Sequence, residues 1–328
     1  MQIVAAADKF KGTASAADVA RAIAAAVEAA GHSSVQIPMA DGGEGTLQVL
    51  GGANRLSTVT GPLGSRVDAS WRLHEGTAVI EMAQAAGLVL AGGPEANDPI
   101  MATTRGVGEL IIEAVDRGAE RIIVGVGGSA TTDGGLGAVE AIGLIDKLAS
   151  AEIEIACDVR THFVEAAAVF GPQKGASPEQ VAFLTERLET LATRYFQSFN
   201  VDVSSMPRAG AAGGLAGGLA ALGARLVDGF ELIAEVTGLD AAIADADLVI
   251  TGEGALDAES FNGKVVGGVT KIAQSHGVPV LAVAGQISED ADGQIDAISL
   301  VSEFGIDLAM SETTSCITRA VTDWLERS

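Results

Sequence analysis

Short glycine-rich segments carry most of the residues in this sequence that could do chemistry. They read DKFKG at residues 8–12, DGGEG at 41–45, GGSATTDGG at 127–135 and TGEG at 251–254. Successive backbone N–H groups in such segments can surround phosphate oxygens, as can the first turn of a following helix. One segment alone is more typical of a tight turn between a strand and a helix. Four segments of this kind together predict a phosphate-binding site.

Lysine placement supports the same chemistry. The chain has only six lysines, and Lys9, Lys11, Lys174 and Lys264 lie in glycine-containing segments. A cation inside such a loop neutralises phosphate charge, whereas the alternative for each is a solvated surface side chain. We take Lys11 and Lys264 as the preferred phosphate ligands.

Five carboxylates follow predicted strands and complete the set. They are Asp41, Asp133, Asp158, Glu253 and Asp257. Phosphoryl transfer requires a carboxylate that orients the attacking hydroxyl and others that hold Mg²⁺ on the phosphates. Capping a helix is the competing role, above all for Asp133, which precedes a glycine-rich helix start. Spacing alone does not rank the five.

The elements that position these residues alternate between apolar strands and helices. Ser15 begins an alanine-rich helix to about Ala30, and apolar spacing predicts a helix over Pro178–Phe199. Short runs over Arg55–Ala83 indicate antiparallel hairpins. Strands are expected at residues 3–7, 35–40, 121–127, 153–159, 247–254 and 278–285. This order predicts an α/β fold with a largely parallel sheet, in which ligands bind beyond the carboxyl ends of the strands.

Composition narrows the function classes. The net charge of -23 repels nucleic acids and anionic membranes, and no apolar run is long enough to span a bilayer. Two cysteines do not make a disulfide framework, and the N-terminal segment lacks the pattern of a secretory signal, so we expect a cytoplasmic protein. Aromatic residues make up only 4%, so stacking platforms are scarce.

Several common templates do not occur in the sequence. It contains no P-loop motif, and no dinucleotide fingerprint follows the first strand. The four histidines show no metal-ligand spacing, and Ser129 is not in a G-x-S-x-G elbow.

The longer motifs resemble those of the bacterial glycerate kinases of type 1. In chain order they are AADKFKGTASA, PMADGGEGT, GPLG, TAVIEMAQAAGL, TRGVGELI, GVGGSATTDGGLGA, CDV, VFGPQKGA, AGAAGGLAGGL and DLVITGEGALDAESFNGK. The resemblance covers nearly the whole chain, and motifs such as PMADGGEGT are far more specific than a glycine pattern.

The resemblance implies a fold of two α/β domains. A Rossmann-like or flavodoxin-like domain, placed at residues 1–60 and 240–328, would hold an inserted mixed α/β domain at 61–239, with the active site in the cleft between them.

The resemblance also implies ATP-dependent phosphorylation of D-glycerate with Mg²⁺, favouring 2-phosphoglycerate. On this hypothesis the candidate residues take three roles. The catalytic candidates are Lys11, Asp41, Asp133 and Asp158; the ATP-binding candidates are Gly127, Gly128, Ser129, Gly252, Gly254 and Lys264; the metal candidates are Glu253 and Asp257. Monomer and homodimer are both open.

This chain departs from the family pattern at three places. Ala7 and Lys9 replace a proline and a serine of the first motif, so that a hydroxyl becomes a cation. Roughly two dozen residues are absent between Ile142 and Ile153, and the segment after Asp158 is shorter and poorer in glycine. The two shortened regions motivate one alternative, a catalytically silent protein that binds a sugar acid. A second, an NAD-dependent 2-hydroxy-acid dehydrogenase, is disfavoured because the dinucleotide fingerprint is absent.

Overall fold

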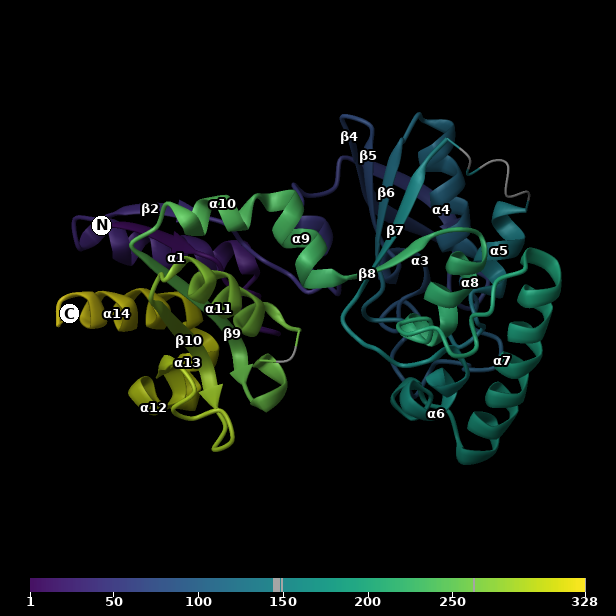
Figure 1. Cartoon of the computed structure of the whole chain (residues 1–328). Helices are drawn as coiled ribbons and strands as arrows, with labels where there is room; N and C mark the ends of the chain where they lie inside the picture. Colours follow the sequence, from purple (N-terminus) through teal and green to yellow (C-terminus); the bar gives the residue numbers. More distant parts are fainter. Residues whose placement is uncertain (144–147, 149, 262, 328) are drawn as a thin grey trace. The chain divides into compact units, whose positions relative to one another are not determined.

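The chain divides into two compact units in the computed structural model, which describes residues 1–143, 148, 150–261 and 263–327. Unit 1 comprises Met1–Asp41 and Phe230–Ser328, and unit 2 comprises Gly42–Gly229. Unit 2 is therefore inserted in the sequence of unit 1, between purple and green segments of the same unit (Figure 1). The junctions lie before the positions expected from the sequence, which were near residues 60 and 240. Residues 144–147 and 149 of the shortened segment after Ile142 lie outside the described residues.

Unit 1 is built on a sheet in the order β11-β10-β9-β1-β2, and the neighbouring strands in its described part are all parallel. The strands are β1 (Gln2–Ala5), β2 (Ser33–Gln36), β9 (Leu248–Leu256), β10 (Val280–Ile287) and β11 (Asp296–Ser299). Strand β2 ends earlier than predicted. The extended backbone nevertheless continues beside β1, because Ile37 and Met39 donate N–H bonds of 2.9 Å to the carbonyls of Ala5 and Ala7.

Helices cover both faces of this sheet. Along β10, Leu281 and Val283 join one apolar cluster, with α1 and α14, while Ala282 and Ala284 join another, with Val266 of α11. This alternation follows from the two-residue period of a strand. The helices of unit 1 are α1 (Ala16–Ala29), α9 (Gly229–Thr237), α10 (Leu239–Ala244), η5 (Ala258–Phe261), α11 (Val265–His276), α12 (Leu300–Phe304), α13 (Ile306–Ser311) and α14 (Thr313–Leu325).

Unit 2 contains a mixed sheet in the order β3-β4-β5-β6-β7-β8 over its described residues. The first two pairs are antiparallel, and the remaining pairs are parallel. The strands are β3 (Arg55–Thr60), β4 (Arg66–His74), β5 (Thr77–Glu81), β6 (Arg121–Gly125), β7 (Glu152–Cys157) and β8 (Arg225–Asp228). The hairpins predicted over Arg55–Ala83 are confirmed.

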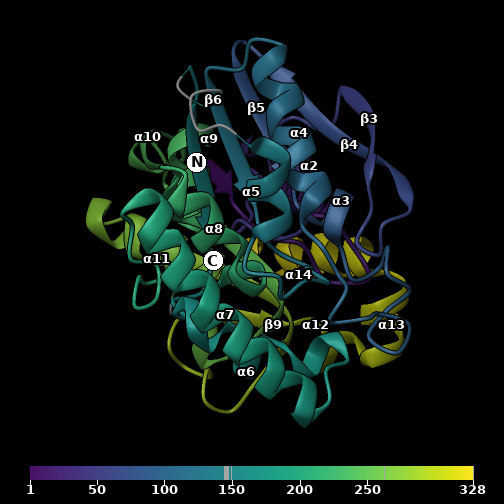
Figure 2. The same cartoon turned by 90° about the vertical axis from the view of Figure 1, so that its right-hand side faces the viewer.

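One extended apolar cluster forms the core of unit 2, with Trp71, Ile122 and Leu188 fully buried. Helix α4 contacts the sheet and packs on α5, as both views show (Figures 1 and 2). The helices are α2 (Thr46–Val49), α3 (Ala83–Ala86), α4 (Arg105–Asp116), α5 (Leu136–Ile142), η2 (Phe163–Glu165), α6 (Ala166–Phe170), η3 (Pro172–Lys174), α7 (Pro178–Phe199), η4 (Ala211–Gly214) and α8 (Leu215–Ala221).

The α/β fold with a parallel-sheet unit and an inserted mixed unit is confirmed. Helices α1 and α7 begin where the sequence placed them, because Ser15 and Ser177 each form a capping box. Strands β8 and β11 were not predicted: each has four residues and a polar end, too short a run for a periodic pattern. No helix in the described ranges has the length and apolarity to span a membrane.

Close packing of two strands accounts for the glycine at position 252. A Cβ atom there would lie 2.2 Å from the carbonyl oxygen of Val283, its partner in β10. We therefore expect Gly252→Ala to lower the free energy of unfolding by about 2 kcal/mol, since the methyl group forces β9 and β10 apart. Urea unfolding measures this. Gly254→Ala is the matched control, because its Cβ would have a nearest neighbour at 3.3 Å, and equal stability of the two variants would contradict the packing account.

Candidate functional site

A cavity of about 420 Å³ lies in unit 1 at the carboxyl-terminal parts of β9 and β10 and beyond the carboxyl end of β1. Its charged lining consists of four carboxylates and three lysines: Asp8, Asp41, Glu253, Asp257, Lys9, Lys11 and Lys264. Its size is that of a typical small-molecule site. The position is the one expected for ligands of open α/β sheets.

Parallel pairing of β1 and β9 brings the two glycine-rich segments of unit 1 together. Ala5 pairs with Ile250, and beyond this pair the N–H of Asp8 donates a bond of 2.9 Å to the carbonyl of Gly252. A Cβ at Gly254 would lie 3.3 Å from the backbone nitrogen of Lys11. The DKFKG and TGEG segments therefore pack directly on each other.

Glu253 is a partly buried carboxylate in the carboxyl-terminal half of β9. Burial raises the pKa of Glu253 to about 7, opposed by a hydrogen bond from Ser260 and by Lys264, and reinforced by the charges of Asp8 and Asp257. Within the described residues its Oε1 atom is buried without a hydrogen-bond partner. An oxygen in this state is suited to accept a proton, a hydroxyl group or a cation.

Asp8 follows β1 and lies in the same electrostatic environment. Its side chain is 14% exposed, and its Oδ1 accepts the N–H of Lys9 at 2.7 Å and lies 3.7 Å from Lys9 Nζ. Burial raises the pKa of Asp8 to about 6; Lys9 opposes the shift and Asp41 adds to it. Near neutral pH the cavity thus holds two carboxyl groups close to their midpoints.

Asp257 and Lys264 mark the segment between β9 and α11. Asp257 Oδ1 accepts bonds from the backbone N–H and the hydroxyl of Ser260, at 3.0 and 3.1 Å. Burial alone would raise the pKa of Asp257, but these bonds and Lys264 lower it. Lys264 is the N-cap residue of α11, so an ammonium group stands where the helix dipole is positive. This end of the cavity favours an anion.

The structure gathers half of the predicted site residues at this cavity. Lys11, Asp41, Glu253, Gly254, Asp257 and Lys264 all line it, whereas Gly252 lies inside β9 against Val283. The sequence analysis missed Asp8, and it counted Lys9 among the lysines of glycine-containing segments without preferring it as a phosphate ligand. Asp8 was detectable, because it directly follows the apolar run Ile3–Ala7, as the other chosen acids follow theirs.

The other predicted residues belong to unit 2, where Asp133 organises a buried loop. The Asp133 carboxylate accepts bonds from the N–H and hydroxyl of Thr104, at 2.8 and 2.9 Å, and from the N–H groups of Gly135 and Gly137, at 3.1 and 3.2 Å. It is only 7% exposed. This carboxylate joins the starts of α4 and α5, the capping role that competed with catalysis in the sequence.

Gly127, Gly128 and Ser129 follow β6, at the carboxyl end of a parallel strand as predicted. A Cβ at Gly127 would lie 2.7 Å from Gly43 Cα, so the GVGGSA and DGGEG segments approach each other closely. Glu81, which is 7% exposed, holds the second segment by accepting the N–H groups of Gly45 and Leu47 at 2.9 Å.

Three side chains from distant segments hold the backbone of residues 130–132. Asn97 Nδ2 donates to the carbonyl of Ala130 at 3.0 Å, Lys174 Nζ to that of Thr131 at 2.7 Å, and Arg187 Nη2 to that of Thr132 at 2.8 Å. Lys174 is 2% exposed, and burial lowers the pKa of Lys174 to about 7, opposed by Asp133. This lysine, a phosphate candidate in the sequence, acts here as an internal support of the loop.

Asp158 lies exposed at the carboxyl end of β7. The neighbouring Cys157 carbonyl accepts a bond of 2.8 Å from Arg208, which also pairs with Asp228 at 2.9 Å. Asp158 thus stands beside an ordered Arg208–Asp228 pair at the ends of β7 and β8.

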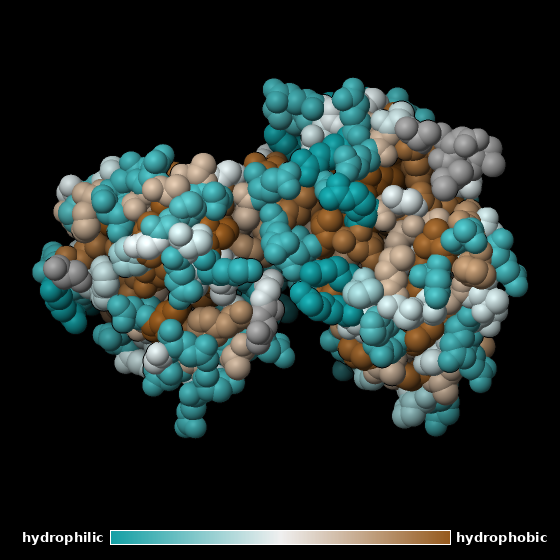
Figure 3. Space-filling model, viewed as in Figure 1, coloured by the Kyte–Doolittle hydropathy of each residue, from teal (hydrophilic) through white to brown (hydrophobic). Residues whose placement is uncertain are grey.

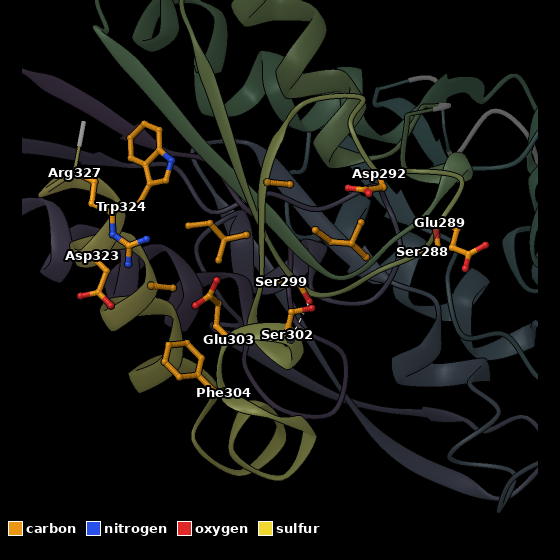
Figure 4. Close-up of a pocket in the computed structure, with 14 residues that line it drawn as sticks. Ser288, Glu289, Asp292, Ser299, Ser302, Glu303, Phe304, Asp323, Trp324 and Arg327 are labelled. Carbon is orange, nitrogen blue, oxygen red and sulfur yellow. Dashed lines mark hydrogen bonds between the residues drawn. The ribbon is translucent and has the colours of Figure 1, made fainter.

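A second cavity of unit 1, of about 460 Å³, has a more strongly acidic lining (Figure 4). Its lining holds Glu289, Asp292, Glu303 and Asp323 but only Arg327 as a cation. Four carboxylates around one guanidinium repel a polyphosphate. The described residues also contain no cluster of three or more His, Cys, Asp or Glu side chains that could hold a metal ion. The lysine-lined cavity is therefore the better anion site.

Fold and cavity define a two-unit α/β protein with a lysine- and carboxylate-lined site at the ends of parallel strands. Comparison with known proteins identifies its family. The sequence profile of the Glycerate kinase family matches residues 3–147 and 143–327. "Glycerate 2-kinase" of Escherichia coli K12 is 40% identical, covering 96% of this chain and 91% of its own, and "Glycerate kinase" of Halalkalibacterium halodurans is 40% identical, covering 94% and 90%.

A solved structure agrees with these relatives. The crystal structure from Salmonella typhimurium LT2, provisionally named glycerate kinase 2, superposes with a TM-score of 0.86 at 36% identity, covering 100% of this chain and 98% of that one. The chain belongs to the glycerate kinase family. The family and the kind of enzyme predicted from the motifs are thereby confirmed.

The buried Lys174 makes stability depend on pH. Its pKa in the folded protein, about 7, lies below the ordinary 10.5, so the unfolded state binds more protons between these values and stability rises with pH there. Relative to Lys174→Met, we expect the wild-type free energy of unfolding to gain about 2 kcal/mol between about pH 7 and about pH 9. Urea unfolding of both proteins over this range measures the gain, and a difference that does not vary with pH would show Lys174 to be charged.

The electrostatic coupling between Asp8 and Glu253 can be measured directly. The charge of Asp8 contributes to the raised pKa of Glu253, so Asp8→Asn should lower the Glu253 titration midpoint from its value near 7. Carboxyl carbon NMR of both proteins reports that midpoint. Asp290→Asn, an exposed acid that does not line the lysine-lined cavity, is the control, and an unmoved Glu253 midpoint in Asp8→Asn would contradict the coupling.

Proposed function

We propose that this protein is a glycerate kinase that transfers a phosphoryl group from ATP to D-glycerate, with 2-phosphoglycerate as the favoured product. The observation that carries the proposal is the cavity of unit 1, in which Lys9, Lys11 and Lys264 share one wall with carboxylates. Membership of the glycerate kinase family supports the reaction, and the name of the Escherichia coli relative, "Glycerate 2-kinase", supports the 2-hydroxyl as acceptor.

The lysines would bind and neutralise the phosphates. Lys264 stands at the start of α11 and Lys11 in the loop after β1, so ammonium groups reach the cavity from two elements. Positioning and charge stabilisation are the main terms in phosphoryl transfer, and both require cations fixed by the fold. Gly254 of β9 lies beside the loop that carries Lys11, since a Cβ at this position would be 3.3 Å from the backbone nitrogen of Lys11.

Asp41 would orient the substrate hydroxyl, and Asp8 and Glu253 provide further acceptors nearby. A carboxyl group with a pKa near 6 or 7, as in Asp8 and Glu253, can accept a proton at neutral pH without being permanently protonated. The catalytic roles of Asp133 and Asp158, and ATP binding by Gly127, Gly128, Ser129 and Gly252, stay predictions.

The residues present fit Mg²⁺ held jointly with a nucleotide. Mg²⁺ is usually bound through one or two carboxylates together with phosphates and waters, so a cage of three protein acids is not required. Glu253, with its unpartnered buried oxygen, and Asp257 would hold the ion. When bound, the ion would neutralise charge that develops on the phosphates.

The reaction itself is the first test. Purified protein is incubated with ATP, Mg²⁺ and D-glycerate, and the products are identified by phosphorus NMR. We expect 2-phosphoglycerate. The 3-isomer alone would overturn the choice of hydroxyl, and neither isomer would overturn the kinase and favour a silent binding protein.

Substitutions in the cavity test the placement of the site. Lys11→Ala and Asp41→Ala should each lower kcat/KM by at least about tenfold, because each removes a group proposed to act on the transferred phosphoryl group or its acceptor. Lys271→Ala is the control, since this exposed lysine of α11 does not line the cavity. Wild-type rates in both cavity variants, with unchanged circular dichroism, would mean that the site lies elsewhere.

A further inference from the structure

The lysine-lined cavity has a second wall that the phosphate chemistry does not use. This wall is apolar, in contrast to the charged lining. It is formed by Val301 of α12 and by Ile306, Ala309 and Met310 of α13. Figure 1 shows these two helices next to the end of β10, and α12 contacts both β10 and α13. The cavity thus joins a cationic region to an apolar one within a single unit.

Two large side chains of the apolar wall are exposed to an unusual degree for their residue types. Ile306 is 61% exposed and Met310 is 57% exposed. Positions 306, 309 and 310 are three and four residues apart, so a single helical turn presents all three on one side. Hydrophilic residues cover much of the visible surface with apolar residues between them (Figure 3), and isolated exposed apolar side chains are ordinary. A group of them that lines a cavity indicates a ligand.

Charge decides what kind of ligand fits both walls. Lys9, Lys11 and Lys264 can bind an anionic part of a ligand, and the α12–α13 wall can bind a flat or bulky apolar part of the same molecule. A nucleoside triphosphate has this division, whereas glycerate is too small and too polar to cover the second wall. Only 4% of the residues are aromatic, so few aromatic side chains are present to stack on a base. Met310 can take that place, because the polarizable thioether of methionine packs well on aromatic rings.

We propose that the wall formed by Val301, Ile306, Ala309 and Met310 holds the nucleobase of the phosphoryl donor, while the three lysines hold its phosphates. This inference rests on the proposed function, because it takes the donor to be a nucleotide. Gln286, which also lines the cavity, carries an exposed amide that can donate to and accept from a base edge.

The test compares a ligand that has a base with one that lacks it. Calorimetry measures the Kd of ATP and of inorganic tripolyphosphate, each with Mg²⁺, for wild type, Ile306→Ser, Met310→Ser and Leu308→Ser. Leu308 is the matched control: it lies in α13, is 43% exposed and does not line the cavity. We expect Ile306→Ser and Met310→Ser to weaken ATP binding by about five- to tenfold and to change tripolyphosphate binding by less than about twofold.

Three results would overturn the inference. If both cavity variants bind ATP with the wild-type Kd, the base lies elsewhere. If the affinities for ATP and for tripolyphosphate fall by the same factor, the substitutions act on the charged region instead. If Leu308→Ser weakens ATP binding by the same factor, the effect is not specific to the residues that line the cavity. Light scattering on the same variants tests whether a second copy of the chain covers the wall instead. If wild type is a dimer, and Met310→Ser is a monomer with unchanged ATP affinity, the wall is a dimer interface.

The inference and the proposed function fail in different ways. If wild-type protein forms phosphoglycerate while the variants keep their ATP affinity, only the inference is wrong. If wild-type protein forms no phosphoglycerate and binds neither ATP nor tripolyphosphate, both are wrong.

Discussion

Parallel pairing of β1 with β9 is the constraint on which the candidate site depends. The ladder from Ile3 and Leu248 continues to the bond between Asp8 and Gly252, and it carries two acidic residues to the same edge of the sheet. Neither carboxyl group is fully solvated there, so burial raises the pKa of both Asp8 and Glu253. Such a pair is costly unless cations or ligands compensate it. The lysines from the neighbouring loops supply that compensation.

The glycine-rich segments do more than one kind of work in this fold. At Gly252 and Gly127 the missing side chain lets backbone approach backbone, which is a packing requirement that would exist without any ligand. At Gly254, also within β9, a Cβ would lie 3.3 Å from the backbone nitrogen of Lys11, so the strand runs close to the loop after β1 at the cavity. A glycine pattern in the sequence cannot separate these two uses, because both demand the same residue. The position of each glycine in the sheet separates the two uses.

The sequence was sufficient for the fold class, the hairpins, the capped helices and the family, since each rests on local periodicity or on long motifs. The sequence also predicted that Lys11, Glu253 and Lys264 lie at one site, and all three line the same cavity. It could not distinguish Lys174, whose 2% exposure depends on packing among Asn97, Thr131 and Arg187 from distant segments. Nor could it predict that α13 would leave Ile306 and Met310 exposed beside the lysines, because their spacing is equally typical of a buried helix face.

The central claim is that the lysine-lined cavity of unit 1 binds the phosphates of the donor. A crystal structure of the protein with Mg²⁺ and a non-hydrolysable ATP analogue tests it most directly. We expect phosphate oxygens within hydrogen-bond distance of the Nζ atoms of Lys11 and Lys264. An analogue bound away from both lysines, for example in the acidic cavity beside Glu303 and Asp323, would contradict the account.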